Sequence, residues 1–261
     1  MLDSTQRTTA AELLWAAERD LAPIGPLTET FPGIDVVDAY EIQLGNIRRK
    51  LAAGARVRGH KVGLSSPVMQ QMMGVDEPDY GHLLDGMIVD QDAPIEAGRY
   101  CYPRIEVEIG YVLGSALPGA GCTEADVLAA TEYIVPSLEL IDSRITDWRI
   151  KLADTIADNA SSAGFVLGAG RVAPTDIDIT QIEAELTCNG EVVAKGRSDA
   201  VLGNPVTAVA WLARKVESFG VRLRAGDIVL PGSCTRAIDA RPGDKFVAEF
   251  AGLGSVRLSF E

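Results

Sequence analysis

The spacing of apolar residues predicts helices in the first part of the chain and strands in most of the remainder. A first helix is expected at "LLWAAERDL", where Thr9 and Glu12 have the spacing of a capping box. A second helix is expected over residues 37–51, and Gly54 can end it. Its apolar face consists of residues at three- and four-residue steps: Val37, Tyr40, Leu44, Ile47 and Leu51.

Later segments predict short strands, turns and two more helices. "RVRGHKVGLSS" predicts a strand and turn, whereas the Gly, Pro and Asp residues of "MQQMMGVDEPDYGHLLDGM" predict a loop. "YPRIEVEIGYVL" and "PSLELID" predict strands, and Asn189-Gly190 predicts the type I′ turn of a hairpin. Thr123 caps a short helix over "TEADVLAATEYIV", and Asn204-Pro205 begins another that ends before Gly220. "RAGDIVLPG" and "RPGDKFVAEF" introduce the last strands.

Helices followed by a strand-rich body indicate an α+β fold, because an α/β fold would alternate the two. We expect one globular unit, in which a helical N-terminal segment (residues 1–75) packs on a strand-rich body (residues 76–261). A dinucleotide fold is disfavoured because "LGAGRV" lacks the third glycine of the G-x-G-x-x-G pattern.

Charge and composition narrow the classes of partner. The 261 residues include 37 acidic and 24 basic side chains, a net charge of −13 that argues against a nucleic-acid partner. No apolar run is long enough to cross a membrane, and the N-terminus lacks a signal peptide, so we expect a cytoplasmic protein. Four scattered cysteines and two histidines make a zinc site improbable.

The stretch "RIEVEIG" contains the first candidate site. Strand alternation places Glu106 and Glu108 on one face together with Gly110, which would leave room for a ligand. Two such glutamates can converge on one ion, and oxygen ligands suit Mg²⁺ or Mn²⁺. Taken alone, the same pattern more often marks the solvated face of a sheet.

Other polar residues have two interpretations each. Glu139 in "PSLELID" would complete a three-carboxylate site, although a single strand glutamate is usually on the surface. Lys61 could neutralise a substrate carboxylate or transfer a proton, or could lie on the surface, and His60 could be structural. "DEPDYGHLLD" contributes loop carboxylates and one histidine: Asp76, Glu77, Asp79 and His82. "DNASSAGFVLG" contributes small polar groups that bind a carboxylate or cap a turn: Asn159, Ser161 and Ser162.

Several separated motifs together resemble one enzyme family. They are "GHKVGLSS", "MMGVDEPDYGHLLD", "PRIEVEIG", "LELIDSRI", "DNASSAGFVLG", "GNPVTAVAWLA" and "GDIVLPGSCTRAI". From about residue 35 to the end, the chain resembles the 2-hydroxypenta-2,4-dienoate (2-oxopent-4-enoate, vinylpyruvate) hydratases. Within that group it is most similar to the 2-hydroxyhexa-2,4-dienoate hydratases of bacterial sterol catabolism.

The resemblance implies a mixed β-roll of the fumarylacetoacetase C-terminal type with flanking helices. It also implies Mg²⁺ or Mn²⁺ held by Glu106, Glu108 and Glu139, with Lys61 and Asp79 in the catalytic pocket and Ser161 contacting the substrate carboxylate. We then expect a homo-oligomer, a pentamer or decamer, with a downstream aldolase or other pathway enzyme as a further partner. No membrane partner is expected.

The implied reaction is metal-assisted addition of water to a dienol acid, giving a 4-hydroxy-2-oxo acid, with Asp79 carrying the proton. A 4-oxalocrotonate decarboxylase would share the fold and metal site but needs a cation for the distal carboxylate of its substrate. An acylpyruvate-type hydrolase would need His60, His82 or a glutamate as a base. The remaining alternative is a non-catalytic partner subunit, which would bind no divalent metal.

Overall fold

Two antiparallel-rich sheets form the body of the computed structural model, which describes residues 1–67, 70–71 and 74–261. The predicted loop at "MQQMMG" lies partly outside the described residues, at Met69, Met72 and Met73. The described strands are β1 (Val57–Gly63), β2 (Asp79–Leu84), β3 (Arg104–Leu113), β4 (Thr131–Ile141), β5 (Ser162–Leu167), β6 (Glu183–Cys188), β7 (Glu191–Arg197), β8 (Ile228–Leu230), β9 (Ile238–Asp239), β10 (Lys245–Phe250) and β11 (Gly254–Ser259).

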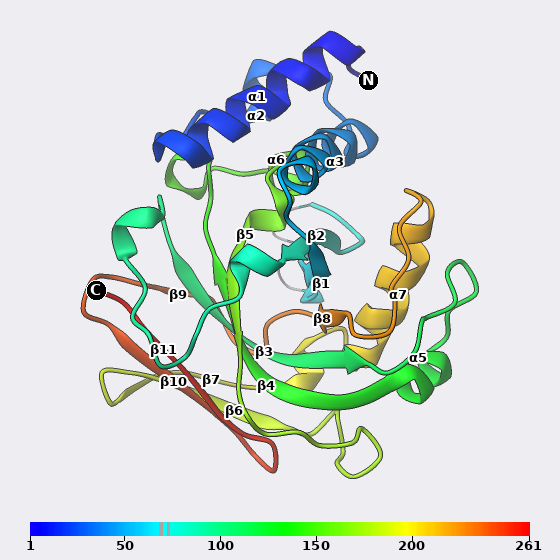
Figure 1. Cartoon of the computed structure of the whole chain (residues 1–261), viewed down its shortest axis with the longest axis vertical. Helices are drawn as coiled ribbons and strands as arrows, with labels where there is room; N and C mark the ends of the chain where they lie inside the picture. The colour runs from blue at the N-terminus through cyan, green and yellow to red at the C-terminus, as the bar shows by residue number, and fades with distance from the viewer. Residues whose placement is uncertain (68–69, 72–73) are drawn as a thin grey trace.

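The larger sheet has the order β2-β1-β8-β3-β4-β5, with β9 paired to β3, and the smaller has the order β11-β10-β6-β7. Within the described residues these sheets contain seven and four strands. The pair β1–β8 is parallel and the other pairs are antiparallel, so the predicted mixed β-structure and α+β class are confirmed. The larger sheet curls around its strands β3 and β4, below which the smaller sheet lies (Figure 1).

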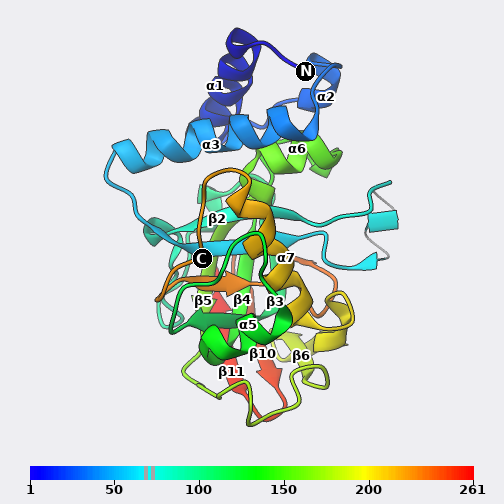
Figure 2. The same ribbon diagram turned by 90° about the vertical axis from the view of Figure 1, so that its right-hand side faces the viewer.

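Helices cover one end and one side of the sheets (Figures 1 and 2). α1, α2, α3 and α6 lie together beyond β2, and α7 lies beside α5 along the other flank. No helix among the described residues is long and apolar enough to cross a bilayer. The bounds are α1 (Ser4–Asp20), α2 (Leu27–Thr30), α3 (Val36–Ala52), α5 (Glu124–Ala130), α6 (Leu152–Ala157) and α7 (Pro205–Glu217).

The ends of the predicted helices follow local capping chemistry. α7 begins as predicted, since the Asn204 side chain accepts a hydrogen bond from the Val206 amide, and Thr123 caps α5. The predicted start of the first helix was wrong. Asp3 and Gln6 form the capping box, so the helix begins five residues before Thr9.

Two other expectations were wrong at the edges of elements. The α3 face is buried at Tyr40, Leu44 and Ile47, but Val37 and Leu51 are exposed because the ends of the helix extend past the core. The segment from Asp79 to Leu84 was expected to be a loop but forms β2, whose six residues are all buried. A strand buried on both faces shows no alternation of polarity. The glycine and aspartate of this segment, which are typical of loops, therefore led to the wrong prediction.

The core packs between the two sheets. Ile105, Val107 and Ile109 on β3 are 0–1% exposed and face away from the glutamates of the same strand. Burying each such side chain contributes roughly 1.5–3 kcal/mol, which offsets the cost of holding polar groups on the opposite face. The hairpin turn has φ values of 54° at Asn189 and 86° at Gly190, as its predicted type I′ geometry requires.

Candidate active site

Two neighbouring strands bring the three predicted metal ligands together. β3 and β4 are antiparallel, and their register places Glu106 directly opposite Glu139. Glu108 follows two residues along β3 on the same face. One carboxylate oxygen from each of the three lies within 4.8 Å of the others. Glutamates 33 positions apart in sequence therefore form a single cluster.

Burial gives this cluster an unusual electrostatic state. Glu108 and Glu139 are 0% exposed, so the alternative of a solvated sheet face is wrong for both residues. Burial, together with the neighbouring carboxylates of Glu139 and Glu106, raises the pKa of Glu108 well above its usual range. Burial likewise raises the pKa of Glu139 to about 7, against the opposing influence of the Lys61 ammonium.

The β1–β2 hairpin supplies the lysine and the aspartate. Lys61 is only 3% exposed, so its surface alternative is wrong, and its Nζ lies 3.4 Å from Glu139 Oε2. Burial alone would lower the pKa of Lys61, but the surrounding carboxylates raise it, so the side chain stays charged. Asp79 lies opposite Gly63 in the hairpin, and a Cβ added at Gly63 would overlap Asp79 Oδ1 and lie 3.6 Å from Lys61 Nζ. The glycine therefore lets the two charged groups share one small space.

These residues line a cavity of about 260 Å³. Lys61, Asp79, Glu106 and Ser161 are on its wall, which shows that the structure brings together the predicted residues of different strands. Burial raises the pKa of Asp79 to about 6, because the low-dielectric surroundings disfavour its charged form. Much of the remaining wall is apolar or weakly polar: Leu64, Ile141, Trp148, Ile150, Thr155, Ala160 and Ala237.

A left-handed turn presents the last two polar contacts. Asn159, Ala160 and Ser161 have φ values of 55°, 48° and 56°, a conformation that costs non-glycine residues roughly 1–2 kcal/mol each. The turn aims the Ala160 carbonyl at Lys61, which donates to it at 3.0 Å. It also holds the Ser161 hydroxyl in the cavity wall. Strain of this kind, held by a well-packed surrounding, is typical of functional sites.

Unpartnered oxygens show that the cluster suits a divalent cation. Within the described part of the chain, both oxygens of Glu139 and Oε1 of Glu108 are buried without a hydrogen-bond partner, and Glu139 Oε2 has only the ion pair with Lys61 at 3.4 Å. The other oxygen of Glu108 accepts from the Gly232 amide at 2.8 Å, which fixes its orientation. Several like charges at this depth are unfavourable without a cation, and an all-oxygen donor set fits Mg²⁺ or Mn²⁺.

Asp79 and Ser161 also have polar atoms available to a ligand in the cavity. Neither carboxylate oxygen of Asp79, nor Oγ of Ser161, has a hydrogen-bond partner among the described residues. Unsatisfied buried polar atoms cost stability, so their retention indicates a ligand that hydrogen-bonds to them.

Some predicted features lie elsewhere. Gly110 leaves no room for a ligand, because Val135, Leu167 and Leu230 fill the space beside it. His60 and His82 point away from the cavity, on the opposite face of the hairpin, and neither lines it. Asn159 exchanges hydrogen bonds of 2.8 and 3.0 Å with the backbone of His82, which is a structural role.

Two carboxylates of the predicted loop are also outside the cavity. Asp76 is exposed, and Glu77 pairs with Lys215 at 2.8 Å. Both therefore have the solvent-facing role that loop carboxylates usually have.

Sequence reasoning missed three residues of the site. Arg104 lines the cavity, pairs with Asp239 at 2.8 Å and stacks on Trp148 at 4.4 Å. Gly63 was quoted only within a motif, and Gly232 has a φ of 123° and lies so close to Ser65 that a Cβ would overlap its hydroxyl. An arginine two residues before Glu106 on the same strand was a signal that could have been used, but no pattern in the sequence indicated the contact of Gly232 with Glu108.

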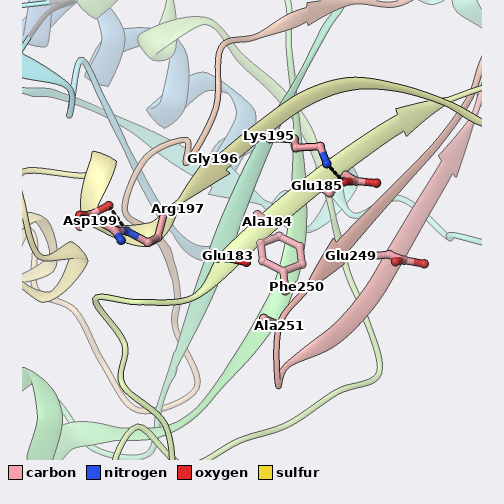
Figure 3. A pocket seen from close by; sticks show the side chains of 10 residues that line it. All are labelled: Glu183, Ala184, Glu185, Lys195, Gly196, Arg197, Asp199, Glu249, Phe250 and Ala251. Atoms are coloured by element: carbon pink, nitrogen blue, oxygen red, sulfur yellow. Dashed lines mark hydrogen bonds and ion pairs between the residues drawn. The ribbon is translucent and has the colours of Figure 1, made fainter.

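Among the described residues, a larger concavity on the smaller sheet lacks the buried, unpartnered polar groups of the catalytic cavity (Figure 3). Its volume is about 760 Å³, and charged residues of β6, β7 and β10 line it. Lys195 pairs with Glu185 at 2.6 Å and Arg197 pairs with Asp199, as Figure 3 shows. Its charged side chains are exposed or half-buried, so solvent stabilises them and nothing indicates a ligand.

Comparison with known proteins gives consistent results. Residues 70–261 match the model of the family described as fumarylacetoacetate (FAA) hydrolase, C-terminal. The chain is 44% identical over 256 residues to the 2-keto-4-pentenoate hydratase of Paraburkholderia xenovorans, covering 98% of this chain and 95% of that protein. It is 39% identical to the 2-hydroxyhexa-2,4-dienoate hydratase of Comamonas testosteroni, covering 100% and 99%. The structure of 4-oxalocrotonate decarboxylase from Pseudomonas putida G7, complexed with magnesium and adipate, superposes with a TM-score of 0.97 at 36% identity, covering 100% and 99%.

Proposed function

This chain belongs to the fumarylacetoacetate hydrolase C-terminal family, and from that premise we propose that it is a metal-dependent hydratase. Its substrate would be a 2-hydroxy-2,4-dienoate, such as the pentadienoate or hexadienoate, and its product a 4-hydroxy-2-oxo acid. The observation that carries the proposal is the buried cluster of Glu106, Glu108 and Glu139 beside Lys61 and Asp79. Relatives named as hydratases at 39–44% identity support the reaction class.

The three glutamates would hold the metal. A bound Mg²⁺ or Mn²⁺ supplies Lewis acidity that stabilises negative charge on an oxygen of the substrate. Glu108 is preorganised for this role by the Gly232 amide, and Glu106, the half-buried member, lines the cavity where substrate enters. The glutamates act as ligands in this proposal, and none is needed as a base.

Lys61 and Ser161 would bind the acid group of the substrate. The Lys61 ammonium is permanently charged, lies in the cavity wall and is held by the Ala160 carbonyl. A carboxylate placed beside it exchanges solvation for a charge-assisted hydrogen bond. The unpartnered Ser161 hydroxyl, on the adjacent left-handed turn, can donate a second hydrogen bond to the same group.

Asp79 would move the proton. Its pKa of about 6 is near neutral pH, so the carboxyl can both donate and accept a proton during turnover. In the protonated form it delivers a proton to C5 of the dienol and takes back the proton that the C2 hydroxyl gives up, which yields an α,β-unsaturated 2-oxo acid. Water then adds across the C3–C4 double bond, with its oxygen at C4, the conjugate position, and its proton at C3, so Asp79 ends the cycle protonated. Apolar walls such as Ile141 and Ile150 keep bulk water from the substrate tail.

Two observations favour a second candidate, a 4-oxalocrotonate decarboxylase. Arg104 places a guanidinium in the cavity wall, where a distal carboxylate could reach it, and the TM-score of 0.97 was obtained with a decarboxylase. However, Arg104 is already neutralised by Asp239 at 2.8 Å, so a second carboxylate would have to compete for it. This pairing is the physical reason for preferring a substrate with an uncharged tail.

A spectrophotometric assay tests the proposal. Loss of dienol absorbance is followed with 2-hydroxypenta-2,4-dienoate and its methylated homologue, with Mg²⁺, with Mn²⁺ and after EDTA. We expect metal-dependent hydration, a strong loss of rate in Asp79→Asn, and none in Asp76→Asn, which changes an exposed residue three positions away. Release of CO₂ from 4-oxalocrotonate without hydration of either dienoate would favour the decarboxylase instead.

Finer features of the prediction also remain proposals. We propose that the enzyme prefers Mg²⁺ or Mn²⁺, acts in the catabolism of aromatic or sterol rings in the cytoplasm, and forms a homo-oligomer. A pentamer or decamer would be recognised by its mass in solution. The division into residues 1–75 and 76–261 is likewise a proposal, although β1 from the first of these segments is a strand of the main sheet.

A further inference from the structure

A second pocket lies on the reverse face of the strands that carry Lys61 and Asp79. In the β1–β2 hairpin, His60 is opposite His82 and Lys61 is opposite Gly81, so the imidazoles point away from the catalytic cavity. Both histidines line a separate pocket of about 340 Å³, together with residues of α3 and of the segment that follows α7. The two cavities share no lining residue.

The walls of this rear pocket are apolar and its mouth is cationic. Apolar side chains from three separate segments face it, including Leu44, Ile47 and Phe219. Three arginines also line it: Arg48, Arg222 and Arg224. One aspartate, Asp227, lines the pocket as well, so cationic side chains outnumber anionic ones among its lining residues, on a chain whose net charge is −13.

Arg224 is the guanidinium available to a ligand. Arg48 lies 3.8 Å from Glu41 and Arg222 lies 3.0 Å from Glu217, so both are partly neutralised. Within the described residues, the Arg224 side chain makes no hydrogen bond or ion pair, and its backbone amide is bonded to the acidic lining residue Asp227.

The two histidines make a polar floor without adding charge. His60 is 1% exposed, and neither of its ring nitrogens has a partner among the described residues. His82 Nδ1 lies 3.0 Å from Gln43 Oε1, and since Gln43 uses its amide group to donate to two carbonyls, Nδ1 must be the donor. Burial lowers the pKa of both rings, so both are neutral near pH 7 and recognition of charge falls to the arginines.

We propose that the rear pocket is a non-catalytic binding site for a small carboxylic acid with an apolar body. The carboxylate would pair with Arg224 at the mouth, and the body would pack on Leu44, Ile47 and Phe219. The inference does not depend on the reaction proposed for the catalytic cavity, because the two sites lie on opposite faces of the hairpin.

Binding of 4-fluorobenzoate, measured by ¹⁹F NMR on metal-free protein, tests this site. Arg224→Gln removes the cation, and Leu51→Glu places a like charge at the rim, where Leu51 is 38% exposed. Arg171→Gln removes the same charge from an exposed position outside the pocket and is the matched control. 4-Fluorobenzyl alcohol has the same body without the charge.

We expect both pocket variants, and the alcohol, to bind about tenfold more weakly, with Arg171→Gln unchanged. Equal affinity in Arg224→Gln and Arg171→Gln would refute the site, as would equal affinity for acid and alcohol. Loss of binding in Lys61→Met with full binding in Arg224→Gln would assign the acid to the catalytic cavity and overturn the proposal. The proposal would also be overturned if 4-fluorobenzoate did not bind at concentrations up to about 10 mM, because a specific site should have a dissociation constant below that value.

Discussion

Replacing Asp79 with asparagine should make metal-free protein more stable, and more so as the pH rises. The carboxyl is 1% exposed, and burial raises its pKa to about 6 from its ordinary value of 3.8. A group whose pKa is higher in the folded state contributes stability below its unfolded pKa, and that contribution is lost as the pH rises through the folded pKa. Wild-type protein therefore loses stability between about pH 4 and pH 6, whereas an asparagine cannot ionise.

The size of the effect follows from the two pKa values. Relative to the unfolded chain, the raised pKa of Asp79 costs the folded state about 3 kcal/mol at pH 8 and about half as much at pH 5. The difference in unfolding free energy between Asp79→Asn and wild type should therefore grow by roughly 1–2 kcal/mol from pH 5 to pH 8. A constant offset from altered packing or hydrogen bonding cancels in this comparison.

Urea unfolding of EDTA-treated protein at the two pH values measures this difference, with the m-value checked for constancy. Asp76→Asn is the control, since that residue is exposed and its variant should follow wild type at both pH values. A difference between Asp79→Asn and wild type that does not change with pH would refute the argument that burial has raised this pKa. A smaller difference at pH 8 than at pH 5 would refute its sign.

Three further predictions concern the cavity. Glu106→Gln should weaken Mn²⁺ binding at least about 100-fold by calorimetry without changing the far-UV circular dichroism, and full metal affinity would contradict the ligand assignment. Lys61→Met should lower kcat/KM about 100-fold or more, since the buried cation next to Glu139 is lost; an unchanged value would remove Lys61 from the mechanism. Gly63→Ala should lower kcat about tenfold or more, because the new Cβ would displace the Asp79 carboxylate. Gly45→Ala is the control, because nothing lies close to Gly45 on α3. This variant should keep full activity and gain about 0.5–1 kcal/mol of stability. Equal losses of activity in the two alanine variants would contradict the steric argument.

Local patterns were sufficient for much of the secondary structure. Helix periodicity, the Asn204-Pro205 start and the Asn189-Gly190 turn act within a few residues, so the sequence carries them directly. Where two local signals competed, the prediction failed. Thr9 and Asp3 both begin plausible capping boxes, and in the structure Asp3 forms the box while Arg7, in the turns before Thr9, pairs with the distant Asp38.

The alternation in "RIEVEIG" determined which glutamates share a face. Glu139, Lys61 and Asp79 were candidates with surface or turn alternatives, and the resemblance to known hydratases favoured their place in the site. Alternation could not reveal that this face is buried, because burial depends on β1, β5 and β8, which come from distant parts of the chain. The same limit hid the burial of Lys61 and the true state of β2.

By itself, then, the sequence determined the residue types, their local faces and the class of chemistry. Tertiary structure alone decided that Glu139 lies opposite Glu106, that Gly232 fixes Glu108 and that Arg104 reaches the cavity already paired. It also decided that adjacent residues of one strand, His60 and Lys61, serve two separate pockets. The physical reason is that pKa values and unsatisfied hydrogen bonds arise from burial, and burial is a property of the assembled sheet rather than of any stretch within it.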